Sequence, residues 1–328
     1  MNQNTSTGPP PPAPSHRADA SRPFFAHLRL KRWRVPAIVL VLLGMLLAMQ
    51  FLPGAVVALV LVAIEGEEVL NDPARLAGRP VLVLSSNIAL GLLIPAVLLV
   101  MRWIGGVPWS SVLANGRAFS WRRLLVLLPV MVPAFVAALL VTALVMPGTS
   151  GSFSVTGATL TLLFITVFTM PLASAAEEVL FRGGIGPAVG SWFRGEKTAV
   201  IVGLLASTVL FGVMHFSGDP WLIAYQLWFG LVMGLLALTT RGIEASIAFH
   251  ATHNVVLFVW AMVMSGGSGL AIDRGVSDDN ANMVVMLSFV PFHLLLLAIV
   301  HLMERRRRSQ EHQETPAPQP RPATTDAA

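Results

Sequence analysis

The sequence predicts an all-α fold, a polytopic membrane helical bundle with about eight transmembrane helices. Hydrophobic residues make up 55% of the 328 residues, charged residues only 12%, and the mean hydropathy is +0.71. A soluble domain carries about 25% charged residues. Apolar stretches also recur at about the 20-residue length that an α-helix needs to cross a bilayer. The composition therefore favours a membrane protein over a packed globule in water.

The chain divides into five parts. The Pro-rich residues 1–35 are predicted to be a disordered cytoplasmic tail, and residues 36–156 hold the first three spans. Residues 157–264 hold four spans, residues 265–303 an outer loop and the last span, and residues 304–328 a basic and then Pro-rich disordered cytoplasmic tail. The eight predicted spans are residues 36–64, 80–103, 123–146, 157–181, 198–215, 221–239, 243–264 and 283–303.

Basic residues set the predicted orientation. Of the 22 Lys and Arg residues, only Arg75, Arg79 and Arg274 lie in the loops opposite the termini. By the positive-inside rule both termini are then cytoplasmic, in a plasma membrane protein. Orientation in the lipid bilayer accounts for the excess of basic over acidic residues, so no nucleic-acid partner is implied. The chain has no cysteine, which excludes a thiol nucleophile.

Ionisable side chains inside the spans are the candidate functional residues. Each costs about 2.5–3.5 kcal/mol on insertion scales, so such residues tend to mark function. The residues of this kind, with one neighbouring amide, are Glu177, Glu178, His215, His250, His253, Asn254 and His293.

The two adjacent glutamates of "AAEEVLFRGG" have different helical neighbours. Residues i and i+4 share a helix face, so Glu178 faces Arg182, whereas Glu177 faces Phe181. We therefore expect Glu178 to form an ion pair within its helix. Glu177 must find a partner on another helix.

Three short motifs follow one another on successive spans. "EEVLFR", "FGVMH" and "HATHN" match EExxxR, FxxxH and HxxxN in order. In these motifs, over about residues 157–264, the sequence resembles the CPBP family of intramembrane endopeptidases, which is related to the CAAX prenyl protease. The resemblance implies hydrolysis of a peptide bond in a membrane-associated protein or peptide, lipidated or not.

The resemblance also implies roles for the motif residues. Glu177 would act as general base on a water, assisted by His215, while His250 and Asn254 would polarise the scissile carbonyl and hold its oxyanion. Glu178 and Arg182 would form the supporting ion pair. His253 matches none of the motifs and is left outside this site. His293 is predicted to be an interfacial or hydrogen-bonded residue.

Metal dependence stays open between two mechanisms. Glu177, His215 and His250 could supply three protein ligands to a catalytic zinc and leave a position for water. The family has been described both as metalloproteases and as metal-independent glutamate peptidases. We favour the glutamate mechanism, which requires no cofactor.

Other classes fit the sequence less well. Every aspartate lies in a tail or predicted loop, which excludes an aspartyl protease, and H-E-x-x-H is absent. "GGSG" at 266–269 precedes a polar loop and reads as a loop signal rather than a serine-protease site. The alternative function is a transporter or proton-coupled channel with a buried Glu/His cluster. It is less favoured because the first three spans are nearly free of charge.

One expectation conflicts with straight helices of the predicted lengths. Glu177 would lie near the inner end of the span 157–181, whereas His215 would lie near the outer end of the span 198–215. The two side chains meet only if residues 185–197 are interfacial and the fifth span is tilted, or if the "FSGDPW" break lies at membrane depth.

Overall fold

The computed structural model describes residues 17–72, 76, 78–146, 153–265 and 281–314. Its principal helices are α1 (Arg34–Glu65), α3 (Pro80–Gly91), α4 (Leu93–Val100), α5 (Trp109–Leu113), α6 (Trp121–Leu125), α7 (Leu128–Val145), α8 (Gly157–Glu178), α9 (Gly186–Gly190), α10 (Glu196–Val213), α11 (Pro220–Thr240), α12 (Glu244–Met264) and α13 (Ala281–Glu314). Short segments of tighter or wider helix are η1 (Glu67–Asn71), η2 (Met101–Gly105) and η3 (Val179–Ile185). The predicted all-α class is confirmed.

Eight helical stretches of the described chain are long and apolar enough to cross a membrane, as predicted. The protein is therefore a multi-pass membrane protein. The fourth stretch is longer than expected, because α8 continues through η3 and α9 to Gly190 rather than stopping at residue 181. Glu177 thus lies roughly 20 Å before the end of this continuous helix. Much of the expected mismatch in depth between Glu177 and His215 disappears.

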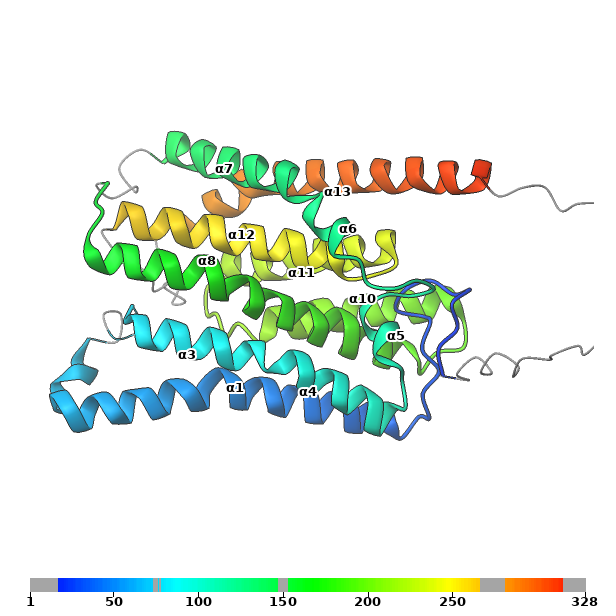
Figure 1. Cartoon of the computed structure of the whole chain (residues 1–328), viewed down its shortest axis with the longest axis horizontal. Helices are drawn as coiled ribbons and strands as arrows, with labels where there is room; N and C mark the ends of the chain where they lie inside the picture. Colours follow the sequence, from blue (N-terminus) through cyan, green and yellow to red (C-terminus); the bar gives the residue numbers. More distant parts are fainter. Residues whose placement is uncertain (1–16, 73–75, 77, 147–152, 266–280, 315–328) are drawn as a thin grey trace, which may run out of the picture.

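The helices form three layers (Figure 1). α1, α3 and α4 form one outer layer, α7 and α13 form the other, and α8, α10, α11 and α12 lie between them. α8 packs closely on both α3 and α12, so it is the central helix of the bundle. The first described residues and the end of α13 lie at the same end of the molecule, as an even number of spans requires.

The prediction of a disordered tail is wrong for residues 17–35. Phe24 and Phe25 are both fully buried in the main core. A side-chain carbon added at Gly186 would lie 2.6 Å from the Phe25 ring, which is a steric clash. The Phe25 ring can therefore pack against this position because residue 186 is glycine. The difference comes from the short apolar run "PFFAHL" at residues 23–28. The prediction was based on the composition of the whole Pro-rich segment, in which this run is a small part. Residues 1–16 lie outside the described residues.

The prediction of disorder is also wrong for residues 304–314, because α13 continues to Glu314. Glu304 and Arg308 form an i,i+4 ion pair on this helix at 3.6 Å, and Arg308 also donates to the Thr239 carbonyl. The Pro-rich residues 315–328 lie outside the described residues, as do "GGSG" at 266–269, Arg75 and Arg274.

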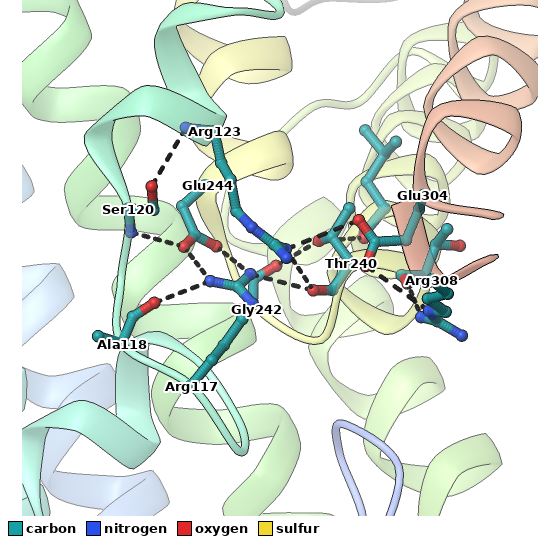
Figure 2. A network of polar contacts seen from close by, with 11 residues as sticks. Arg117, Ala118, Ser120, Arg123, Thr240, Gly242, Glu244, Glu304 and Arg308 are labelled. Carbon is teal, nitrogen blue, oxygen red and sulfur yellow. Dashed lines mark hydrogen bonds and ion pairs between the residues drawn. The ribbon is translucent and has the colours of Figure 1, made fainter. Parts of the chain in front are cut away.

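A buried ion pair fixes the start of α12 (Figure 2). The carboxylate of Glu244, 1% exposed, accepts hydrogen bonds from both terminal nitrogens of Arg117 and from the backbone N–H of Ser120 at 2.9 Å. Arg117 also donates to the Thr240 carbonyl at 3.0 Å. The loop before α6 is therefore tied to the first turn of the helix that carries "HATHN".

Candidate active site

Glu178 lies at the centre of a buried polar cluster between α8 and α12. It is fully buried, and its Oε1 accepts from the Arg182 guanidinium at 3.0 Å and from His250 Nδ1 at 2.8 Å. Arg182, also fully buried, donates to the Gly230 carbonyl of α11 at 2.8 Å and lies over the Phe211 ring at 4.6 Å. The predicted i,i+4 pair is present, and His250 joins it as a third member.

Glu177 has a different environment from its neighbour. Its side chain is 18% exposed and lines a cavity of about 520 Å³. Its Oε2 lies 4.0 Å from His250 Nε2, so the expected partner on another helix is an imidazole of α12. His250 therefore stands between the two carboxylates, with one ring nitrogen toward each.

His215 lies just past the end of α10 and lines the same cavity as Glu177. Its Nδ1 is 2.7 Å from the Phe211 carbonyl oxygen, which can only accept, so Nδ1 carries the proton of this bond. The bond fixes the ring against the last turn of α10. His215 and Leu222, the residues on either side of the "FSGDPW" break, both line the cavity.

Asn254 also lines the cavity, one helical turn after His250. Its Nδ2 donates to Ser174 Oγ of α8 at 3.2 Å, and its Oδ1 lies 3.1 Å from His253 Nδ1. The structure therefore brings together all four residues of the predicted catalytic set, Glu177, His215, His250 and Asn254, around one cavity.

Two hydrogen-bonded ring residues of the cavity, His253 and Tyr225, were not part of the predicted site. His253 was left outside the site because no motif includes it, yet it is 4% exposed, lines the cavity and hydrogen-bonds Tyr225 Oη of α11 at 2.6 Å. Tyr225 is the single tyrosine of the chain, and that rarity was the one sequence signal available. His293 is hydrogen-bonded, as predicted, and accepts from Trp228 Nε1 at 3.1 Å; it is buried rather than interfacial.

The first and second spans supply the opposite wall of the cavity. α1 contributes Leu46 and Gln50, and α3 contributes Ser86 and Asn87. These four side chains are uncharged. Among all the residues that line the cavity, Glu177 is the single acidic one. The N-terminal helices, which carry no motif, therefore help to shape the site.

The proposed zinc ligands do not form a ready metal site. Within the ranges that the structure describes, no three His, Asp or Glu side chains are grouped so that they could hold one metal ion. The Nδ1 hydrogen bonds of His215 and His250 do not bear on this point, because metal-ligating histidines are commonly held in the same way. We therefore derive no catalytic step through a metal.

Fold and site together define a polytopic membrane protein with a buried Glu/His/Arg cluster beside an intramembrane cavity. Residues 156–256 match the family described as "Type II CAAX prenyl endopeptidase Rce1-like". This interval contains all three motifs, so the family resemblance that they predicted is confirmed over these residues.

A curated relative is the uncharacterized protein YyaK of Bacillus subtilis (strain 168). It is 28% identical over 198 residues, which cover 58% of this chain and 63% of that protein. The chain thus spans less than two thirds of the length of this relative. No solved structure matches the chain.

Proposed function

We propose that this protein is a CAAX-type intramembrane endopeptidase in which Glu177 activates the attacking water. The family match supports the class of enzyme. One observation carries the assignment of the base: Glu178 is fully buried with its Oε1 held by Arg182 and His250, whereas Glu177 lines the cavity. A general base must reach a water and a substrate, and only Glu177 of the pair meets this condition.

The reaction is a hydrolysis with balanced proton transfers. Glu177 takes one proton from water as the hydroxyl oxygen bonds to the scissile carbonyl carbon. The C–N bond then breaks, and the proton passes to the leaving amine. His215, on the wall of the same cavity, assists in holding the water and returning the proton.

Geometry supports His250 as an oxyanion donor. Its Nδ1 lies 2.8 Å from Glu178 Oε1, which leaves Nε2, 4.0 Å from Glu177 Oε2, as the ring nitrogen that can act on a water or a carbonyl oxygen beside Glu177. Donation from Nε2 requires a proton on that nitrogen. Asn254 Nδ2 supplies a second donor to the developing oxyanion.

We propose a metal-free mechanism, with zinc as the alternative. The described residues include no group of three His, Asp or Glu side chains close enough together to hold one metal ion, which supports this mechanism. Metal analysis of purified, active protein tests this point. Metal below a tenth of the protein concentration, with chelator-resistant activity, is expected; stoichiometric zinc with chelator-sensitive activity contradicts it.

The proposed substrate is a membrane-associated protein or peptide, lipidated or not. Uncharged residues form much of the cavity wall, as an apolar or neutral substrate segment requires. Profiling of new peptide termini in membranes that contain wild-type or Glu177→Gln protein is the experiment. At least one terminus is expected with the wild type alone, and identical profiles would favour the transporter alternative.

We also propose that both termini face the cytoplasm of a plasma membrane protein. The division of basic residues supports this orientation. Because the chain has no native cysteine, Val155→Cys should react only with reagent added outside, and Ser309→Cys only after the membrane is opened. The reverse pattern would overturn the orientation.

A further inference from the structure

We infer that His253 and Tyr225 are positioning residues for Asn254, the amide that the proposed function assigns to the oxyanion. The inference rests on that function and adds two residues that lie outside the three motifs. Its basis is a continuous chain of hydrogen bonds from α11 through α12 to α8. The chain runs Tyr225 Oη to His253 Nε2 at 2.6 Å, His253 Nδ1 to Asn254 Oδ1 at 3.1 Å, and Asn254 Nδ2 to Ser174 Oγ at 3.2 Å.

The chemistry of the groups gives this chain one direction. An amide oxygen only accepts, so the contact with Asn254 requires the proton on Nδ1 of His253. Both partners of His253 are neutral, and Phe135, Phe229 and Phe289 surround its ring within 5.3 Å between centroids. A buried charge without a counter-ion is costly, so the imidazole is neutral and its Nε2 accepts. The Tyr225 hydroxyl must then be the donor.

The direction of these hydrogen bonds fixes the orientation of the Asn254 amide. With Oδ1 held by His253, the amide presents its NH₂ group away from that contact. One N–H goes to Ser174, and the other is left for the cavity that Asn254 lines. A flipped amide would present its oxygen toward the oxyanion and repel it. The bond from His253 therefore holds Asn254 in the orientation in which its NH₂ group can donate to the oxyanion. The bond from Tyr225 favours the Nδ1–H tautomer of His253, which is the one that can donate to Asn254 Oδ1.

Burial keeps this arrangement fixed. Tyr225 and His253 are 7% and 4% exposed, and their rings pack at 6.0 Å between centroids. Neither residue contacts Glu177 or the Glu178 carboxylate through a hydrogen bond in the described structure. Loss of either side chain should leave the general base intact and act through the oxyanion donor alone.

The test compares kcat and KM for cleavage of an identified substrate. His253→Phe should lower kcat about 100-fold, close to the effect of Asn254→Ala, because removal of an oxyanion donor costs on the order of 10²–10³-fold in kcat. Tyr225→Phe, which removes one hydroxyl, should lower kcat about 10-fold through loss of one hydrogen bond. KM should change less than about threefold in both. His293→Phe is the matched control, a buried histidine of the same aromatic cluster whose hydrogen bond in the described structure goes to Trp228, and it should keep wild-type kcat.

A double-mutant cycle separates positioning from a structural role. In the Asn254→Ala background, His253→Phe should lower kcat no further; an additive loss would overturn the inference. If His253→Phe does not fold, the same cycle with Tyr225→Phe decides the point. The ¹⁵N spectrum of labelled histidine in the wild type is a readout independent of activity, with an Nδ1–H tautomer expected for His253 and an Nε2–H tautomer contradictory. Loss of cleavage in Glu177→Gln with normal cleavage in His253→Phe would refute this inference while leaving the proposed function intact.

Discussion

Replacement of Glu178 by glutamine should destabilise the protein far more than the same replacement of Glu177. The glutamine would remove a buried negative charge that accepts two charge-assisted hydrogen bonds, from Arg182 at 3.0 Å and from His250 at 2.8 Å. Arg182 would keep its bond to the Gly230 carbonyl but lose its counter-charge while fully buried. Breaking a buried pair in this way costs about 3–5 kcal/mol.

Glu177→Gln is the matched control on the neighbouring residue. Glu177 is 18% exposed, and its ionisable partner His250 lies at 4.0 Å, beyond hydrogen-bond distance. We expect a change in stability below about 1 kcal/mol.

Unfolding of the purified variants in mixed micelles, followed by circular dichroism as denaturant increases, measures both changes. The Glu178→Gln midpoint should fall well below that of the wild type, with Glu177→Gln close to it. Equal destabilisation by the two variants would refute the division of roles between the glutamates.

Two further predictions concern His27 and Glu244. Burial lowers the pKa of His27 from 6.5 to about 4, so the folded state favours the neutral ring. The free energy of unfolding is therefore highest above pH 6.5 and falls by about 3 kcal/mol in total as the pH is lowered to 4. A His27→Gln variant should lose this acid sensitivity in denaturant titrations between those pH values, and an unchanged slope would disprove the assignment. Glu244→Gln should cost about 3 kcal/mol in the same unfolding assay because Glu244 is the buried partner of Arg117, whereas Glu65→Gln, at an exposed pair, should cost less than about 1 kcal/mol. Similar losses in both variants would show that the Glu244 pair does not hold the start of α12.

The spans were predictable because hydropathy over about 20 residues reports a property of one segment alone. The pair Glu178–Arg182 was predictable for a similar reason, since helical geometry relates residues four apart. Boundaries were less accurate where composition was averaged over a long window. The apolar run that contains Phe24 was lost in a Pro-rich tail, although Phe24 is fully buried.

Contacts between helices were the part that the sequence could not provide. The bond from His250 to Glu178 depends on how α12 packs against α8, and the bond from Tyr225 to His253 depends on how α11 packs against α12. Each of these residues is an ordinary member of its own helix. The motifs indicated which helices carry the chemistry, but the partner of each side chain depends on packing angles that local spacing does not encode.

The central claim is that Glu177 is the general base of a peptide-bond hydrolysis. The most direct measurement is single-turnover cleavage of an identified substrate by detergent-purified wild-type and Glu177→Gln protein. Glutamine keeps the size of glutamate but cannot take a proton from water, so the rate should fall by at least about 10³-fold while substrate binding is retained. Undiminished cleavage by the Glu177→Gln protein would contradict the account.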